Sequence, residues 1–187
     1  MIYKCVLADP PWNEQGGGKS TRGAQRHYPL MKAPAIAELM GEWMDGHVVD
    51  PAHLWLWATS NHLKDAMWVM EKLGFRYVTN AVWVKVSSGD GLLPCSTHQE
   101  AAQDGLQIGL GQYMRHAHEW LLFGARGKAM VPPPARRPPS VIFAPRTKHS
   151  KKPEESFRLI ECVSDGPRLE MFARARRDGW DARGNEV

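Results

Sequence analysis

Residues 2–12 read Ile-Tyr-Lys-Cys-Val-Leu-Ala-Asp-Pro-Pro-Trp, an apolar run that stops at an acid and two prolines. A short apolar run between breakers is typical of a strand that is buried on both faces. Proline cannot donate to the hydrogen-bond ladder, so Pro10 and Pro11 end the pairing. We therefore predict a buried strand over Ile2–Ala8, with Asp9 directly at its carboxyl end.

Outward from this strand, the chain alternates between helical and strand-like patterns. Amphipathic spacing predicts helices that start at Pro34, at Asn61 as an N-cap and at Pro153, and Gly74 is expected to end the second of them. Apolar runs predict the further strands Leu54–Thr59, Tyr77–Lys85, His118–Gly124, Val141–Phe143 and Arg168–Ala173, before a basic tail. This order predicts an α/β fold, with a doubly wound, mostly parallel sheet and helices on both faces.

Length, composition and cysteine content limit the class of protein. The 187 residues, 43% hydrophobic and 24% charged, predict one globular domain over residues 1–187. No apolar run approaches the roughly 18 residues that span a bilayer, and the N-terminus lacks the pattern of a signal peptide. Three cysteines without a CxxC pair argue against a disulfide framework or a zinc site. We expect a cytoplasmic protein without a metal ion.

Basic residues concentrate in one stretch of the chain. The net charge is +4, but between Arg115 and Lys152 nine Lys and Arg stand against a single acid, Glu119. Such a stretch favours binding to a phosphate backbone, and a solvated basic loop is the alternative.

Polar residues follow the ends of several predicted strands. Asp9-Pro10-Pro11-Trp12 follows the first strand, and Thr59 and Arg174 stand at the ends of two others. In parallel α/β sheets, ligands bind beyond the carboxyl ends of the strands. The Pro10 carbonyl is expected to lack a regular hydrogen-bond partner. It and the Asp9 carboxylate could accept both N–H groups of an exocyclic amine, while Trp12 offers a face to an aromatic ring. The alternative is a tight turn in which Asp9 only caps a neighbouring backbone group.

Further short motifs are spread over nearly the whole chain. They are Tyr28-Pro29-Leu30-Met31, Leu54-Trp55-Leu56-Trp57-Ala58-Thr59, Val82-Trp83-Val84-Lys85, His118-Glu119-Trp120-Leu121-Leu122-Phe123-Gly124, Ser150-Lys151-Lys152-Pro153-Glu154-Glu155, Glu170-Met171-Phe172-Ala173-Arg174, Gly179-Trp180 and Gly184-Asn185-Glu186. With Asp9-Pro10-Pro11-Trp12, and in this order, they resemble the DPPW-type adenine-N(6) methyltransferases. That family includes the catalytic subunit of the eukaryotic messenger-RNA adenosine methyltransferase and many phage and prophage DNA methyltransferases.

The resemblance implies a fold, a cofactor and a reaction. The fold would be a Rossmann-like methyltransferase fold in circularly permuted order, with the catalytic motif N-terminal. S-adenosylmethionine would be the cofactor, and its methyl group would move to the 6-amino group of an adenine in nucleic acid. DNA is favoured over RNA because the compact chain is more similar to the phage and prophage members. An RNA methyltransferase and a catalytically silent nucleic-acid-binding subunit stay open, as do a homodimer and a partner subunit.

The resemblance also assigns roles to individual residues. The catalytic residues would be Asp9, Pro10, Pro11 and Trp12. The cofactor would contact Asp9, Ser150, Lys152, Glu170, Phe172, Arg174, Arg176, Asn185 and Glu186, with Lys152 paired to its carboxylate. The nucleic acid would contact Trp12, Arg22, His27, Tyr28, Arg146, His149 and Lys151, with further backbone contacts from Arg136, Arg137 and Lys148.

Some positions depart from the family pattern. The messenger-RNA subunit has Gln where Glu186 stands and His where Arg176 stands. The chain also begins at the strand of the catalytic motif, so we expect its C-terminal tail to replace the preceding segment that contacts the cofactor's adenine in larger relatives. Residues 13–27 form a longer loop, which we interpret as a lid over the nucleic acid.

Two other patterns point to different chemistry and are disfavoured. Gly16-Gly17-Gly18-Lys19-Ser20-Thr21 imitates the end of the phosphate-binding loop of a nucleotide triphosphatase, but Asn13 stands where that motif requires its first glycine. His116 and His118 lack neighbouring acids or cysteines at ligand spacing, so we interpret them as structural or substrate-loop histidines and not as a metal site.

Overall fold

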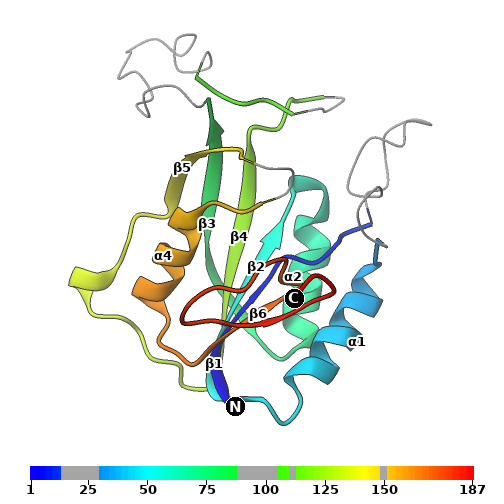
Figure 1. Cartoon of the computed structure of the whole chain (residues 1–187), viewed down its shortest axis with the longest axis vertical. Coiled ribbons are helices and arrows are strands. Elements are labelled where there is room, and N and C mark those ends of the chain that lie inside the picture. The colour runs from blue at the N-terminus through cyan, green and yellow to red at the C-terminus, as the bar shows by residue number, and fades with distance from the viewer. Residues whose placement is uncertain (14–29, 88–104, 110–112, 148–150) are drawn as a thin grey trace.

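The computed structural model describes residues 1–13, 30–87, 105–109, 113–147 and 151–187 of the chain. These residues form a seven-stranded sheet with the order β5-β3-β4-β2-β1-β6-β7 (Figure 1). Its strands are β1 (Tyr3–Ala8), β2 (Val48–Ala58), β3 (Arg76–Val86), β4 (His118–Arg126), β5 (Val141–Pro145), β6 (Arg168–Met171) and β7 (Asp181–Arg183). The helices are α1 (Ala33–Met44), α2 (Leu63–Lys72) and α4 (Glu154–Val163), with short 3-10 turns η2 (Ser60–His62) and η3 (Pro134–Arg136).

Most neighbouring strands of the sheet run parallel, as predicted. β1 pairs in parallel with β2 and β6, β6 with β7, and β3 with β5. β4 is the exception, because it runs antiparallel to both β2 and β3. As a result, the amino end of β4 lies at the same edge of the sheet as the carboxyl ends of β1, β2 and β3.

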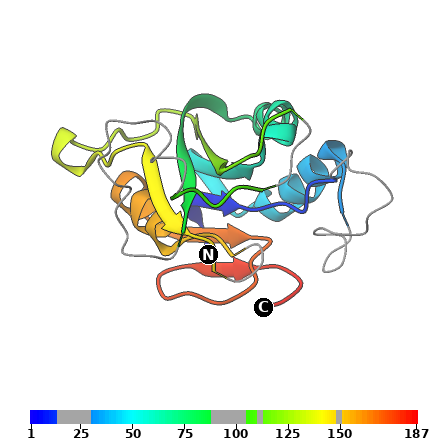
Figure 2. The same cartoon turned by 90° about the horizontal axis from the view of Figure 1, so that it is seen from above.

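Helices cover both faces of the sheet, which confirms the predicted fold class. In β1, Val6 and Ala8 pack with α1 and α2, whereas Cys5 and Leu7 point to the other face and pack with α4. Figure 2 shows α4 separated by the sheet from α1 and α2. Fully burying one large apolar side chain stabilises a fold by about 1.5–3 kcal/mol. Both faces therefore hold β1, and with it Asp9, in a fixed position.

The start of α2 differs from the prediction. Asn61 lies inside η2, the helix begins at Leu63, and no side-chain hydrogen bond caps it. The backbone N–H of His62 donates to the Thr59 carbonyl at 3.0 Å, so a hydrogen-bonded turn precedes the helix and takes the place of the predicted cap. The predicted end is confirmed, since Gly74 has a φ of 80°, a left-handed conformation that glycine adopts without strain.

The C-terminal residues form a strand and not the predicted basic tail. β7 pairs with β6, and the Tyr3 hydroxyl donates to Asp181 at 2.7 Å. Gly184 follows β7 so closely against Ala173 that a Cβ would collide with the Ala173 carbonyl oxygen. The polar composition of the C-terminal residues does not indicate a strand, because the pairing of β7 depends on contacts with residues that are distant in the sequence. No helix among the described residues is long and apolar enough to cross a membrane.

Candidate active site

Asp9 lies in a tight turn at the carboxyl end of β1. The Trp12 N–H donates to the Pro10 carbonyl at 2.9 Å, which closes a three-residue turn around Pro11. The prediction that the Pro10 carbonyl lacks a regular partner is therefore wrong, although a carbonyl oxygen has a second lone pair that can accept. Two further backbone bonds tie the turn to Met31, from Met31 N–H to Pro11 at 2.8 Å and from Asn13 N–H to Met31 at 3.0 Å.

Trp12 anchors this turn in the core. The residue is 7% exposed, and its Nε1–H donates to the Trp57 carbonyl at 2.9 Å. The ring also stacks on His62, with 5.7 Å between centroids and 13° between planes. This packing explains why a tryptophan stands after the two prolines, while stacking on a substrate base stays a prediction.

The Asp9 carboxylate belongs to a cluster of four charged side chains. Lys152 Nζ lies 2.9 Å from Asp9 Oδ1 and 3.1 Å from Glu119 Oε2, and Lys85 Nζ lies 2.6 Å from Glu119 Oε1. All four side chains are between 12% and 19% exposed. We name these residues, Asp9, Lys152, Glu119 and Lys85, the charge row.

The charges in this row stabilise one another against burial. Burial alone would raise the pKa of Glu119, but Lys152 and Lys85 overcome this and lower it to about 2. Burial likewise lowers the pKa of Lys152, but Asp9 and Glu119 outweigh it and leave the pKa raised. At neutral pH Glu119 and Lys152 therefore carry full charge inside the protein.

Strand directions bring the charge row together. Lys85 stands near the end of β3 and Glu119 near the start of β4, which meet at one edge because β4 is antiparallel. Lys152 directly precedes Pro153, the N-cap of α4. Lys85 and Glu119 belong to two of the motifs, but they were not predicted to be site residues. The signal in the sequence that could have identified them is a charged residue near one end of each of two predicted apolar strands.

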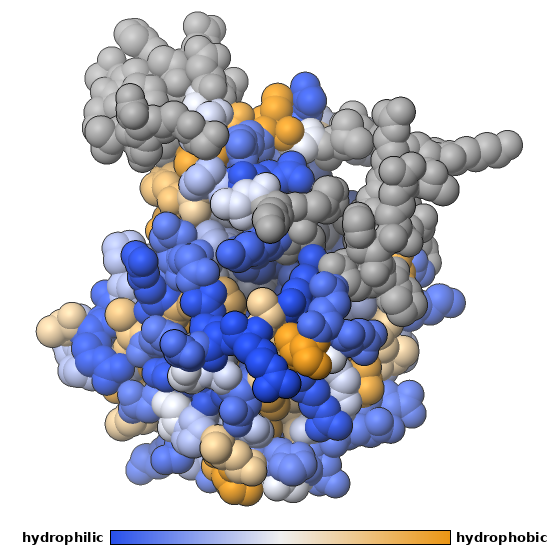
Figure 3. Space-filling model, in the orientation of Figure 1, coloured by the Kyte–Doolittle hydropathy of each residue, from blue (hydrophilic) through white to orange (hydrophobic). Residues whose placement is uncertain are grey.

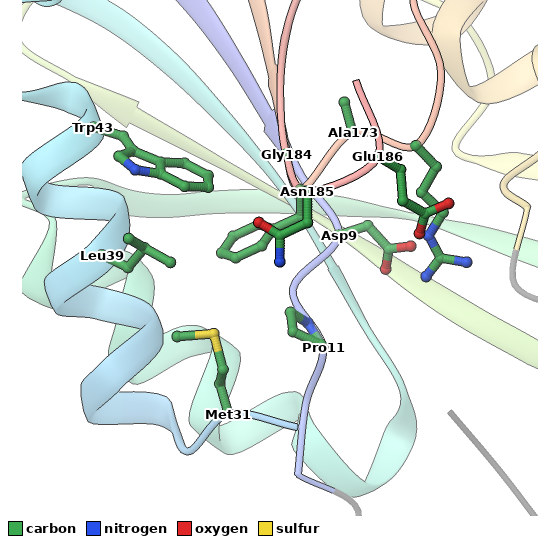
Figure 4. Close-up of a pocket in the computed structure, with 11 residues that line it drawn as sticks. Asp9, Pro11, Met31, Leu39, Trp43, Ala173, Gly184, Asn185 and Glu186 are labelled. Carbon is green, nitrogen blue, oxygen red and sulfur yellow. The ribbon is translucent and has the colours of Figure 1, made fainter. Parts of the chain in front are cut away.

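A small, mostly apolar pocket opens beside Asp9 on the α1 side. Its volume is about 70 Å³. Figure 4 shows Trp43 and Leu39 of α1 and Met31 facing Pro11 and Asn185. Phe172, which also lines it, has a φ of 60°, a left-handed conformation that is rare and strained for a bulky residue. Strain of this kind gathers at functional sites.

A larger and more polar cavity, of about 1130 Å³, lies on the other side of Asp9. It extends over α4 and the loop after β6, a region where hydrophilic residues dominate the surface (Figure 3). Seven of the predicted cofactor residues line it: Asp9, Lys152, Glu170, Phe172, Arg174, Arg176 and Glu186. Asn185 lines the small pocket, and Ser150 lies outside the described residues.

Glu170 has the most unusual environment in the large cavity. Burial raises its pKa to about 7, although Arg177 and Arg174 act in the opposite direction. Arg177 itself binds Glu154 through both of its terminal nitrogens at 2.6 Å and so ties the loop after β6 to α4. A carboxyl group that titrates near neutral pH inside a cavity is typical of a functional site.

The predicted nucleic-acid contacts are only partly placed. Lys151 lines the large cavity and lies 4.0 Å from Glu154, and the exposed Arg146 follows β5. Arg22, His27, Tyr28, Lys148 and His149 lie outside the described residues.

Arg136 is not near Asp9. It pairs with Asp165 at 3.3 Å, ahead of the amino end of β6, whereas Asp9 follows the carboxyl end of the parallel strand β1. Arg136 and Asp9 therefore lie at opposite edges of the sheet, and a contact of Arg136 with the nucleic-acid backbone stays a prediction.

The two cavities offer groups that fit S-adenosylmethionine. The ion pairs of Lys152 use two of the three N–H groups of its ammonium, so one can still donate to a carboxylate. Trp57 Nε1, a buried donor with no hydrogen-bond partner among the described residues, belongs to a residue that lines the large cavity. Asn185 and Glu186 supply acceptors for hydroxyl groups. These donors and acceptors thus suit the amino-acid group and the ribose of S-adenosylmethionine.

Comparison with known proteins places the chain in a family. The MT-A70 family model matches residues 3–186. The chain is 25% identical to the Type II methyltransferase M.MunI of Mycoplasma sp, and the match covers 99% of this chain and 78% of that protein. It is 24% identical to the N(6)-adenosine-methyltransferase catalytic subunit METTL3 of Homo sapiens and to the N(6)-adenosine-methyltransferase MT-A70-like protein of Arabidopsis thaliana.

These matches differ in how much of the relative they cover. In the human and Arabidopsis proteins the match covers 99% of this chain but only 28% and 24% of the relative, so the chain spans about a quarter of their length. The family model, in contrast, leaves out only the first two residues and the last one. The resemblance predicted from the motifs is therefore confirmed, and the chain belongs to the MT-A70 family.

Proposed function

We propose that this protein is an S-adenosylmethionine-dependent methyltransferase that modifies the 6-amino group of adenine in DNA at a specific sequence, and that residues 1–187 act as one domain. One observation carries the proposal. Asp9 is held by Lys152 at the meeting point of a polar and an apolar cavity, and it directly precedes a turn in which the Pro10 carbonyl has a second lone pair that can accept a hydrogen bond.

The chain's own groups orient the amine that reacts. Adenine's amine is a poor nucleophile because its lone pair is delocalised into the ring. Lys152 occupies Oδ1 of Asp9, which leaves Oδ2 to accept one amine N–H, and the Pro10 carbonyl accepts the other. Two acceptors favour the pyramidal nitrogen that can attack. S-adenosylmethionine, when bound, supplies an electrophilic methyl group.

Fixed charges keep these acceptors in place. Lys152 is positioned for the cofactor's carboxylate, while its pairs with Asp9 and Glu119 hold the ammonium still. Because the charge row is buried and paired before any ligand arrives, it does not have to reorganise during the reaction. Positioning and electrostatics then account for the rate, without a covalent enzyme intermediate.

The extent of the match to the Type II methyltransferase favours DNA over RNA. Relatives named as adenosine methyltransferases are several times longer than the stretch they share with this chain, whereas the Type II methyltransferase is matched over 78% of its length. The target base must leave the stack, since a paired adenine hides its amine, or the strand must be single.

A methyl-transfer assay tests the proposal. The protein is incubated with tritiated-methyl S-adenosylmethionine and, in parallel, with duplex DNA, single-stranded DNA and RNA, and the nucleosides are analysed by mass spectrometry. We expect N(6)-methyladenine in DNA, and none with Asp9→Asn. Label in RNA alone would reverse the choice of substrate. No label in any pool, although calorimetry detects cofactor binding, would support the silent partner subunit instead.

A further inference from the structure

Two largely buried residues of the charge row contact neither the cofactor nor the amine in the mechanism proposed above. They are Lys85, which ends the motif Val82-Trp83-Val84-Lys85, and Glu119. The structure makes them the outer half of the charge row, in which positive and negative groups alternate from Asp9 to Lys85. Each oxygen of the Glu119 carboxylate takes a different lysine, so the two ammonium groups do not compete for one acceptor.

We propose that Lys85 is a positioning residue that acts through Glu119 and keeps the Lys152 ammonium available to the carboxylate of the cofactor. The inference rests on the proposed function, because it assumes that Lys152 binds the cofactor. Lys85 itself would touch neither the cofactor nor the reacting amine.

Charge balance within the row gives the physical reason. With Lys85 present, two lysines offset two acids. Without it, Asp9 and Glu119 face Lys152 alone, the row carries a net charge of −1, and an incoming carboxylate is repelled. The side chains of Lys85 and Glu119 are only 14% and 15% exposed, so solvent screens this repulsion weakly.

Lys85 is also held rigidly enough to fix its neighbour. Its backbone N–H donates to Ala117 at 2.8 Å, and its carbonyl accepts from Gln107 at 2.7 Å. Its ammonium lies 5.2 Å from the centre of the Trp83 ring, just as the Lys152 ammonium lies 5.3 Å from the Trp57 ring. A group on a strand with a packed side chain positions a site more sharply than one on a loop.

Binding of two ligands without nucleic acid tests the inference. S-adenosylhomocysteine carries the amino-acid carboxylate, and 5′-methylthioadenosine lacks it. Calorimetry gives the Kd of each ligand for the wild type and for Lys85→Met, Lys85→Arg and Asp50→Asn. Asp50→Asn is the matched control, since it breaks the ion pair of Asp50 with Arg126 at the other end of β4.

Lys85→Met should weaken S-adenosylhomocysteine about tenfold, which corresponds to about 1.4 kcal/mol, and leave 5′-methylthioadenosine unchanged. Lys85→Arg should restore most of the loss, because it restores the charge. Asp50→Asn should bind both ligands as the wild type does. In a Lys152→Met background, Lys85→Met should cause no further loss, because its effect passes through Lys152.

Several outcomes would overturn the inference. An unchanged Kd for S-adenosylhomocysteine, an equal loss for both ligands or additive losses in the double variant would each show that Lys85 does not act through Lys152. If Lys85→Met does not fold by circular dichroism, Lys85→Gln gives the same comparison. A wild type that binds neither ligand would instead overturn the proposed function, and the inference with it.

Discussion

The two edges of the sheet each hold a buried polar cluster, and the clusters are built differently. At the edge of Asp9, the charge row consists of ion pairs. At the other edge, Ser164 joins His53 Nδ1 at 2.8 Å and Trp55 Nε1 at 2.9 Å, next to Cys5. Here burial lowers the pKa of His53 and raises that of Cys5 to about 12, so both stay neutral.

The neutral cluster can be explained by the stability of the fold, whereas the charged cluster calls for a functional explanation. A neutral hydrogen-bonded cluster satisfies buried polar groups at little cost. Burying four charges costs several kcal/mol per ion before their attraction offsets it, and well-packed apolar residues would often be as stable. The charged edge is thus the one that stability alone does not require, and the following experiments test this distinction.

The largest effect is expected from Asp9→Asn. The amide keeps the shape of the side chain but loses the negative charge that holds Lys152 and accepts from the amine. We expect the initial rate of tritium incorporation into DNA to fall at least about 100-fold, the scale for removing one preorganised electrostatic group. A rate near that of the wild type, with the fold intact by circular dichroism, would contradict the mechanism.

Glu119→Ala should cause the largest loss of stability. It leaves Lys85 without its carboxylate partner, and breaking a buried ion pair costs about 3–5 kcal/mol. Urea unfolding monitored by tryptophan fluorescence measures the loss. Because the pKa of Glu119 lies near 2 and the ordinary value is 4.5, the wild type should lose this stability as the pH falls below about 4.5, and the variant should not.

Glu170→Gln should stabilise the protein, with a pH dependence of the opposite sign. The pKa of Glu170 is raised to about 7 in the fold, so stability is lost as the pH rises from 4.5 to about 7. At pH 8 the neutral amide should gain about 3 kcal/mol over the wild type, and at pH 4 almost nothing. A gain in stability that does not depend on pH would mean that ionisation of the Glu170 carboxyl does not destabilise the fold.

The smallest effect is expected at the neutral edge. Ser164→Ala removes the partner of both His53 and Trp55, and leaving such groups unsatisfied costs about 1–3 kcal/mol. Thermal unfolding gives the loss, and methyl transfer should be unchanged below the melting temperature. Equal losses of activity in Ser164→Ala and Asp9→Asn would erase the distinction between the two edges.

Local patterns in the sequence predicted much of the fold. The run before Asp9 gave β1, Gly74 marked the end of α2, and apolar spacing located α1 and α4. Such features depend on neighbours a few residues away. The predicted cofactor residues also gather at one edge, because strand ends and motifs placed them there.

What the sequence missed depends on tertiary contacts. Nothing local specifies that β4 runs antiparallel, so the meeting of Glu119 with Lys85 was not foreseen. β7 was not predicted because it is short and two of its three residues are charged, and because it is fixed by Tyr3 and by the close approach of Gly184 to Ala173. The hydrogen bond from the Trp12 N–H to the Pro10 carbonyl was missed because this carbonyl was expected to lack a regular partner.

The backbone bonds between the Asp9 turn and Met31 bear on how this protein can change. They join residues 11–13 to residue 31. The two points at which the chain leaves and re-enters the site are therefore hydrogen-bonded to each other. The cost of closing a loop grows only slowly with its length. Insertions, deletions or whole exchanges between the fastened points should therefore leave Asp9 where it is.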